Sequence, residues 1–230
     1  MAHHELVGGC DGDVGPSDPG VRCGGRSDGI APACPDGEPL ARIELWNGDI
    51  CDLEVDAIVN AATMSLWMST GVSGEIKRAG GDSIEFAAVR QAPVPLGEAI
   101  VTPAGQLAAK VVIHAVSLDR DRRTNGEIID RAVRSAMARA RELRLASVAF
   151  PAMGTGVGGF PLDEAARVTV RAVRDEIARS PQIDHVTFAM RGAAAYQAFK
   201  AALAEEGDAD GISDTGGPGE GTQIDGVVHA

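Results

Sequence analysis

The segment AFPAMGTGVGGFPLDEAA, residues 149–166, joins an apolar run, a glycine-rich turn and the start of a helix. The N-terminus of a helix carries unpaired N–H groups and a partial positive charge, and both favour a bound anion. Glycines in the turn let the anion approach the backbone closely. The spacing therefore predicts a phosphate-binding loop at residues 154–159.

Two common phosphate motifs do not fit this loop. A loop that binds nucleoside triphosphates closes with Gly-Lys-Ser or Gly-Lys-Thr, whereas Phe160 and Pro161 follow here. The dinucleotide fingerprint, with the spacing Gly-x-Gly-x-x-Gly, is formally present at 154–159. It normally opens the first strand–helix unit and is followed by an acidic residue at the end of the next strand. This loop comes late in the chain, and the next strand-like segment, HVTFAM, has no acidic residue at its end.

A second loop favours a third interpretation. The segment Thr70–Gly74 comes after the apolar run VDAIVNAA (55–62) and also leads into a helix. Two such loops at neighbouring strand ends would hold a diphosphate from both sides through backbone amides, without Lys or Arg. This arrangement suits an acidic chain, which has 33 Asp and Glu against 21 Lys and Arg.

The composition limits the possible classes of function. A net charge of −12 disfavours non-specific nucleic-acid binding, which depends on Lys and Arg displacing counterions. No apolar run approaches the roughly 20 residues of a membrane-spanning helix. The N-terminus lacks the basic-then-apolar order of a signal peptide, and the four cysteines have no short C-x-x-C spacing. We therefore expect a cytoplasmic protein with reduced thiols, no membrane contact, no metal and no cofactor.

Strand-like and helix-like segments alternate through the middle of the chain. Strands are expected at 41–47, 55–62, 97–104, 109–117, 147–153 and 185–190. Helices are expected at 73–91, with a break at Gly80-Gly81 as the alternative, and at 127–145, 161–180 and 193–205. This alternation predicts an α/β fold, a three-layer α/β/α sandwich around a mostly parallel, mixed central sheet. Residues 1–39 and 207–230 are expected to be disordered tails around a domain at 40–206.

Several motifs of the domain occur in a fixed order, namely GDI, VDAIVNAA, GVSGEIKRAGG, PLGEAIVT, VVIHAV and SVAFPAMGTGVGGFPLDEAA. In this order and spacing the chain resembles the macrodomain family, whose α/β/α modules bind ADP-ribose. The resemblance covers about residues 40–205. It implies that Asp49 accepts a hydrogen bond from the adenine amino group. It also implies that the two loops contact the diphosphate and the distal ribose.

The resemblance implies a set of ligand-binding residues, which are Asp49, Ile50, Asn60, Gly71, Val72, Ser73, Gly154, Thr155, Gly156, Val157, Gly158, Gly159, Phe160 and Arg191. Taken alone, Phe160 is as well explained by core packing. His114 is tempting as a general base, but its apolar strand favours a hydrogen-bonded core residue. Trp67 and Met68 either cover a ligand or pack the first loop down.

This chain departs from the family pattern at four positions. Hydrolase members read V-N-A-A-N, whereas Thr63 occupies the last position here and has a shorter reach than Asn. Some members carry an Asp where Ser73 stands, and a neutral hydroxyl is a poor base at neutral pH. Arg191 stands where an aromatic residue often stacks on adenine, and a guanidinium also stacks on a flat base. Gly158 stands where another aromatic residue is often found.

The resemblance thus implies a protein that binds ADP-ribose or ADP-ribosylated molecules in a cleft between two loops. It also implies hydrolysis of the ester-type bond at the distal ribose by a positioned water, with Thr63 and Ser73 as candidate catalytic residues. The alternative is a non-catalytic reader of ADP-ribosylated partners. The neutral side chains of Thr63 and Ser73 favour this alternative, because neither is a strong base.

Overall fold

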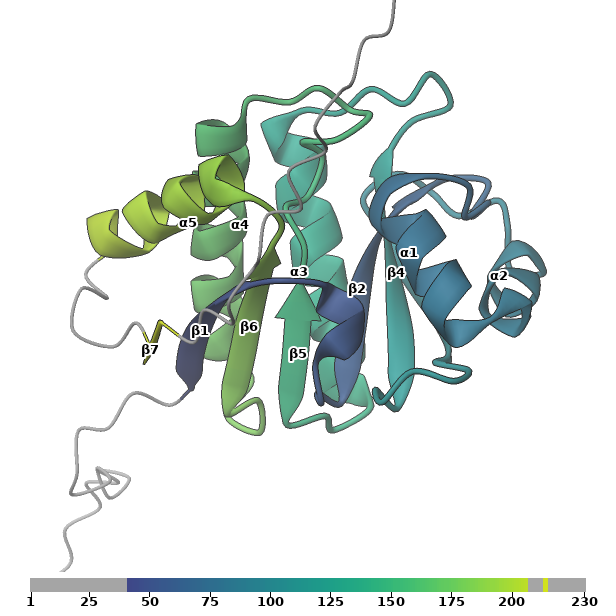
Figure 1. Ribbon diagram of the computed structural model, residues 1–230, viewed down its shortest axis with the longest axis horizontal. Coiled ribbons are helices and arrows are strands. Elements are labelled where there is room, and N and C mark those ends of the chain that lie inside the picture. The colour runs from purple at the N-terminus through teal and green to yellow at the C-terminus, as the bar shows by residue number, and fades with distance from the viewer. Residues whose placement is uncertain (1–40, 207–212, 215–230) are drawn as a thin grey trace, which may run out of the picture. The chain divides into compact units, whose positions relative to one another are not determined.

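The computed structural model describes residues 41–206 and 213–214, and a seven-stranded sheet forms their centre (Figure 1). The strands are β1 (Arg42–Asn47), β2 (Ala57–Thr63), β3 (Ala99–Pro103), β4 (Val111–Leu118), β5 (Ser147–Phe150), β6 (His185–Met190) and β7 (Ser213–Asp214). They lie in the order β3-β4-β2-β5-β6-β1-β7. Only β3 and β4 pair in an antiparallel direction. The predicted mostly parallel, mixed sheet is confirmed.

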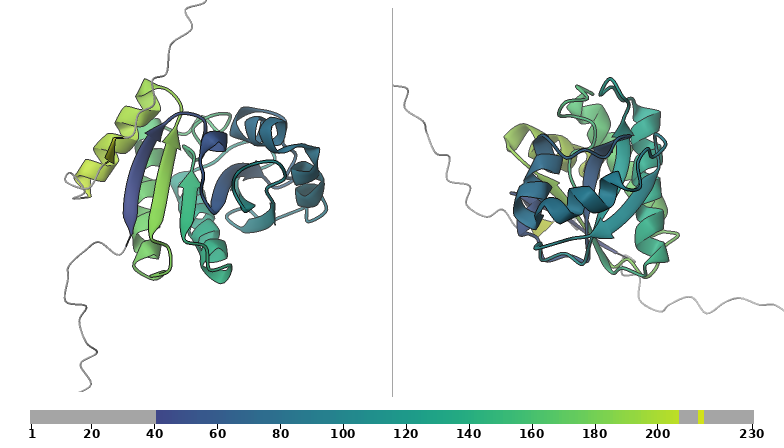
Figure 2. Two further views of the ribbon diagram at one scale, coloured as in Figure 1. Left: turned by 60° about the horizontal axis from the view of Figure 1, so that its bottom comes forward. Right: turned by 90° about the vertical axis from the view of Figure 1, so that its right-hand side faces the viewer.

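Helices cover both faces of this sheet (Figures 1 and 2). They are the short helix η1 (Ile50–Asp52) and the helices α1 (Gly71–Gly80), α2 (Asp82–Val89), α3 (Gly126–Glu142), α4 (Leu162–Ile177) and α5 (Ala193–Glu205). The buried apolar residues of α3, α4 and α5 share one core cluster, and those of η1 and α1 belong to another. The predicted α/β/α sandwich is therefore confirmed.

The period of two along a strand divides the inner strands between the two cores. In β2, Ala57 and Val59 join the core under α3 and α4, whereas Ile58 joins the core under α1. Because both faces are covered, β2, β4, β5 and β6 are buried along nearly their whole length. Their near-continuous apolar sequences follow from this burial.

The helix predicted at 73–91 is divided in two, which confirms the alternative of a break at Gly80-Gly81. Gly81 adopts a φ of +94°, which ends α1 and precedes α2. Its neighbour Gly80 packs so closely that an added Cβ would lie 2.3 Å from Cδ1 of Ile84. At α3, the side chain of Asn125 accepts a hydrogen bond from the amide of Ile128, which caps the helix.

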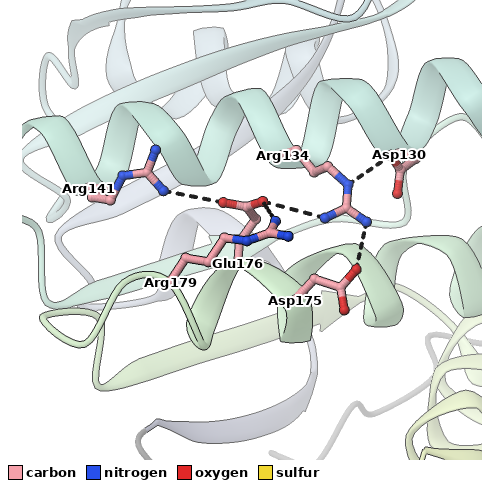
Figure 3. Close-up of polar contacts among 6 residues, drawn as sticks. All are labelled: Asp130, Arg134, Arg141, Asp175, Glu176 and Arg179. Carbon is pink, nitrogen blue, oxygen red and sulfur yellow. Dashed lines mark hydrogen bonds and ion pairs between the residues drawn. The ribbon is translucent and has the colours of Figure 1, made fainter.

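Ion pairs link α3 to α4 on the outer surface of their layer (Figure 3). Arg134 of α3 contacts Asp130 on its own helix at 2.9 Å and Asp175 of α4 at 2.7 Å. Glu176 is nearly buried and contacts Arg141 of α3 at 3.3 Å and Arg179 at 2.7 Å. The network ties the two neighbouring helices α3 and α4 to each other.

The predicted leader at 1–39 lies outside the described residues. Of the predicted tail at 207–230, only Ser213 and Asp214 are described, and they pair in parallel with β1. No helix in the described part of the chain has the length and apolar character needed to cross a membrane.

Candidate functional site

A cavity of about 740 Å³ opens at the carboxyl ends of the parallel strands. β2 pairs with β5 only over Ala57 and Ile58, whereas its pairing with β4 continues to Thr63. The carboxyl ends of β2 and β5 therefore separate. Thr63 lines the cavity from the β2 side and Ala152 lines it from the β5 side. Ligands of open α/β sheets bind at this edge of the sheet.

The strand order sets the order of the groups along the cavity. Asp49 follows β1, Arg191 follows β6, the glycines at 154–158 follow β5, Thr63 ends β2 and Arg120 follows β4. Neighbouring strands lie about 4.8 Å apart, so four strand spacings extend roughly 19 Å. The site is therefore elongated, and we name its two extremes the Asp49 end and the Arg120 end.

The first loop, residues 63–73, leads from β2 into α1. Gly71 has a φ of +60° and begins the helix, and Thr70 precedes it in an extended conformation. The amides of Gly71, Val72 and Ser73 belong to the first helical turn, where no intrahelical acceptor exists. In the described residues these amides donate to no other backbone carbonyl. All three residues line the cavity, so an anion there meets unpaired donors and the positive end of a helix.

The second loop, residues 151–160, leads from β5 into α4. The amide of Gly159 donates to the carbonyl of Gly156 at 3.2 Å, and that of Phe160 donates to Gly154 at 3.2 Å. The amides of residues 155–158 make no backbone hydrogen bond within the described part of the chain. These four residues line the cavity. The loop thus uses two amides to hold its own shape and leaves four for a ligand.

Glycine is required at two positions of the second loop. Gly154 has a φ of +75°, and a Cβ there would lie 2.8 Å from Cδ1 of Ile129. A Cβ at Gly158 would lie 2.6 Å from the carbonyl oxygen of Gly154 and 2.8 Å from Leu118. The present backbone therefore has no room for an aromatic side chain at residue 158.

Most of the predicted site residues line one cavity. They are Asp49, Ile50, Thr63, Gly71, Val72, Ser73, Gly154, Thr155, Gly156, Val157, Gly158 and Arg191. The other three, Asn60, Gly159 and Phe160, are not among the residues that line the cavity. Asn60 is only 1% exposed, the amide of Gly159 closes an internal turn, and Phe160 packs against the core under α3 and α4.

A chain of buried hydrogen bonds connects the first loop to the sheet. The hydroxyl of Ser73 donates to Oδ1 of Asn60 at 2.7 Å and lies 3.2 Å from the carbonyl of Ala61. Nδ2 of Asn60 lies 3.1 Å from Nδ1 of His114, and Nε2 of His114 lies 2.9 Å from Oγ1 of Thr102. The hydroxyl proton of Ser73 is therefore directed toward the sheet and away from the cavity.

His114 is a core histidine in this network, as expected from its strand. Burial lowers the pKa of His114 from 6.5 to about 4, so the ring is neutral at physiological pH. Because the amide nitrogen of Asn60 is a donor, Nδ1 of His114 is the acceptor and Nε2 carries the proton. Nε2 then donates to Thr102. His114 fixes the orientation of Asn60 and is not among the residues that line the cavity.

Charged side chains of both signs meet at the Asp49 end. Oδ1 of Asp49 accepts from the amide of Cys51 at 3.0 Å and caps η1. Oδ2 of Asp49 lies 3.7 Å from Nη2 of Arg191, and Nη1 of Arg191 lies 3.6 Å from Glu75. Arg78 donates to Glu75, and this bond is the main cause that lowers the pKa of Glu75. Arg191 thus bridges two carboxylates that line the cavity.

The side chains of Trp67 and Met68 have different roles in the first loop. Trp67 is 59% exposed and lines the cavity, whereas Met68 is buried in the core under α1. The amide of Met68 donates to Oε2 of Glu85 at 2.7 Å, and Nζ of Lys77 donates to Oε1 of Glu85 at 2.6 Å. Glu85 therefore anchors the segment that presents Trp67. Glu85 could not be predicted as a supporting residue, because nothing local in SIEFAAV (83–89) marks it as buried.

The residues at the Arg120 end of the cavity are also absent from the set predicted from the sequence. Asp119, Arg120 and Arg122 line this end, together with Leu118 and Pro93. The signal was present in the segment DRDRR (119–123), because it follows a buried strand at the edge where ligands bind.

The described residues contain no group of three or more His, Cys, Asp and Glu side chains that could hold a metal ion. Cys51 is half-buried, and burial together with the charge of Asp49 raises its thiol pKa to about 12. A protonated thiol is a weak nucleophile.

Comparisons with known proteins agree with this geometry. The family model of the Macro domain matches residues 59–169. An O-acetyl-ADP-ribose deacetylase of Salmonella gallinarum is 38% identical over 174 residues, which cover 73% of this chain and 97% of that protein. The solved structure of a Trypanosoma brucei macrodomain in complex with ADP-ribose is 27% identical, with a TM-score of 0.67. It covers 73% of this chain and 72% of that chain.

An uncharacterised protein of Mycobacterium tuberculosis is 44% identical over 168 residues, which cover 73% of this chain and 46% of that protein. The chain therefore spans about half the length of this mycobacterial relative. The deacetylase, by contrast, is matched along almost its whole length. On the sequence motifs, the sheet topology and these matches, the chain belongs to the macrodomain family.

Proposed function

We propose that the cavity binds ADP-ribose, free or attached to another molecule, in an extended conformation along the strand ends. The adenine would lie at the Asp49 end, the diphosphate between the two loops and the distal ribose beside Thr63. One observation carries this proposal. Two stretches of the chain, residues 71–73 and 155–158, line one cavity, and their backbone amides have no backbone acceptor among the described residues. A diphosphate is the ligand that such opposed donors fit best.

The base-binding end is supported by the contacts of Asp49. Its Oδ1 accepts a hydrogen bond from the amide of Cys51, whereas its Oδ2 lies 3.7 Å from the exposed guanidinium of Arg191. A carboxylate oxygen accepts a hydrogen bond from the adenine amino group, and guanine offers a carbonyl acceptor at that position. Arg191 would then stack on the base.

We further propose that the protein hydrolyses the ester-type bond between the distal ribose and a carboxylate or acyl group. A water held between a phosphate oxygen and the loop amides would attack the anomeric carbon or the ester carbonyl. Attack at the anomeric carbon breaks its bond to the ester oxygen, so that the water oxygen stays on the ribose and a proton goes to the released carboxylate. Attack at the carbonyl breaks the acyl carbon–oxygen bond, so that the water oxygen stays on the acid and a proton goes to the released ribose hydroxyl. Catalysis would come mainly from holding water and ribose in a reactive geometry, with Thr63 orienting the ribose. Ser73 would act through its bonds to Asn60 and Ala61, by fixing the start of α1.

A second candidate function is a reader that binds without turnover. It is favoured by the hydrogen bonds of the two candidate catalytic hydroxyls. Ser73 donates its proton to Asn60, and Oγ1 of Thr63 lies 3.1 Å from the hydroxyl of Ser65. Neither group is a carboxylate base. In both functions the partners are ADP-ribosylated proteins or metabolites, and a cytoplasmic location stays a prediction.

Two measurements separate these functions. Calorimetry with ADP-ribose, AMP and an oligoadenylate would rank the ligands, and we expect ADP-ribose to bind most tightly. Incubation with O-acetyl-ADP-ribose and with an ADP-ribosylated acidic peptide then tests turnover. Release of acetate or of free ADP-ribose supports the hydrolase, whereas modification that stays bound and uncleaved over hours supports the reader. Failure to bind ADP-ribose at all would contradict both.

Asp49→Ala tests the orientation of the ligand. We expect it to weaken ADP-ribose binding by roughly 1–3 kcal/mol, the usual scale for a hydrogen bond to a charged group. Ribose 5-phosphate, which lacks the base, serves as the control and should bind equally to both proteins. An unchanged affinity for ADP-ribose would remove Asp49 from the base-binding site.

A further inference from the structure

The cavity continues past the position proposed for the distal ribose. Thr63 pairs with Leu118 at the last step of the β2–β4 ladder, where the register shifts. Beyond this pair, Asp119, Arg120 and Arg122 line the cavity on the β4 side. Any group attached to a distal ribose beside Thr63 would therefore leave the site past these side chains.

The charges that line the cavity are separated between its ends. At the Asp49 end, the single guanidinium of Arg191 faces the two carboxylates of Asp49 and Glu75. At the Arg120 end, the two guanidinium groups of Arg120 and Arg122 accompany one carboxylate. The Arg120 end is thus the positive end of the cavity, in a chain whose net charge is −12.

The one carboxylate at this end, that of Asp119, serves the loop itself. Its Oδ1 accepts from the amides of Asp121 and Arg123, each at 2.8 Å, and its carbonyl accepts from the amide of Arg122. These bonds hold a tight turn in which Arg122 adopts a φ of +61°. Both guanidinium groups are exposed, and neither makes a hydrogen bond or ion pair with another described residue. They are therefore positioned by the turn and open to a partner.

We infer that Arg120 and Arg122 recognise an acidic peptide that carries the ADP-ribosyl group. This inference rests on the proposed function, because it assumes that the distal ribose lies beside Thr63 and that the attached peptide leaves the cavity at the Arg120 end. Exposed arginines at the rim of a site attract flanking carboxylates and steer their approach. Two exposed apolar side chains at the cavity, Trp67 and Val157, offer the peptide further contact.

The inference is tested by binding to two matched conjugates. Each is a peptide that carries ADP-ribose through a linkage resistant to hydrolysis. One peptide has Glu residues on both sides of the attachment point, and the other has Gln at the same positions. We expect the full chain to bind the Glu conjugate roughly tenfold more tightly at low salt. The difference should shrink as added salt screens the exposed charges.

Substitutions of the two arginines test whether they cause the preference for the Glu conjugate. In Arg120→Gln/Arg122→Gln the ratio between the two conjugates should fall to near one. Arg123→Gln is the matched control, because Arg123 belongs to the same turn but does not line the cavity, and it should keep the ratio. Arg120→Glu, which leaves Arg122 and its backbone unchanged, gives this end of the cavity the same local charge as the double variant and should likewise bring the ratio to near one.

The outcomes separate this inference from the proposed function. Normal binding of ADP-ribose with equal affinity for the two conjugates overturns the inference alone. A preference that survives in the double variant does the same. Loss of all ADP-ribose binding in the unmodified chain would overturn the proposed function and the inference together. Arginine-dependent binding of an oligoadenylate with the affinity of the Glu conjugate would assign the two side chains to nucleic acid instead.

Discussion

The two loops of the cavity offer similar backbone amides but are held in place by different means. The first loop is fixed by side chains. The hydroxyl of Ser73 donates a hydrogen bond to Asn60, and the carboxylate of Glu85 accepts one from the amide of Met68. The second loop is fixed by its own backbone, whose turns end at the carbonyls of Gly154 and Gly156.

This difference predicts which changes each loop tolerates. A network of side chains responds to protonation and to loss of a hydrogen-bonding group, because an unpaired buried polar group costs free energy. A loop shaped by glycines responds to steric change, because a side chain forces the backbone or its neighbours to move. The two halves of one binding site should therefore fail under different perturbations.

The largest effect is expected for Gly154→Ala in the second loop. Alanine at a φ of +75° is strained, and its Cβ would lie 2.8 Å from Ile129 and 2.9 Å from Thr124. Together these costs should lower the free energy of unfolding by roughly 3–4 kcal/mol, measured by chemical denaturation. Gly156→Ala is the control, since a Cβ there meets nothing within 4 Å. Equal losses in the two variants would contradict a sterically shaped loop.

Acid should act on the first loop through His114. Its pKa is 6.5 when unfolded and about 4 when folded, so the unfolded chain binds more protons between these values. The stabilisation is therefore fully present above pH 6.5 and is lost as the pH falls through 4, by on the order of 3 kcal/mol. His114→Gln should remove this part of the pH dependence. Hydrogen exchange should increase at residues 63–73 before residues 151–160, and simultaneous exposure would contradict the comparison.

Glu85→Ala should loosen the first loop at its other anchor. The variant leaves the amide of Met68 without its acceptor, which should cost about 2 kcal/mol of unfolding free energy. Fluorescence of Trp67 should report the altered loop, with Trp46→Phe as the background so that Trp67 is the only indole. Glu85→Gln keeps an acceptor for the Met68 amide and should retain most of the stability. Equal behaviour of the Ala and Gln variants would exclude this anchoring role.

The second loop could be recognised from its sequence because its shape is encoded locally. Gly154, Gly158 and Gly159 stand where the turn needs a positive φ or leaves no room for a Cβ. The break at Gly81 and the alternation of strands and helices are local signals of the same kind. The antiparallel direction of β3 is also indicated by the sequence. Its connection to β4 has seven residues, which is too short for the crossover that two parallel strands need.

The supports of the first loop could not be predicted in the same way. The strand around His114 predicts a core histidine and the resemblance implies Asn60 as a ligand contact, but the hydrogen bond between them joins residues 54 positions apart. In the structure the side chain of Asn60 bonds to His114 and Ser73. Glu85 reads as an ordinary exposed helix residue, although its carboxylate is buried. Such contacts depend on the packing of the whole sheet, which no local pattern contains.

Ser73→Ala should have the smallest effect on stability and separates support from chemistry. Removing the hydroxyl deprives Asn60 and the carbonyl of Ala61 of one donor, which should cost about 1 kcal/mol of unfolding free energy. If Ser73 only fixes the start of α1, the affinity for ADP-ribose should fall slightly and kcat for an ester-type substrate should change less than KM. A loss of kcat by several orders of magnitude with KM intact would instead place the Ser73 hydroxyl in the chemical step. The first loop would then be a catalytic element as well as a cradle for the diphosphate, and its polar network would have a second purpose that the glycine-shaped loop lacks.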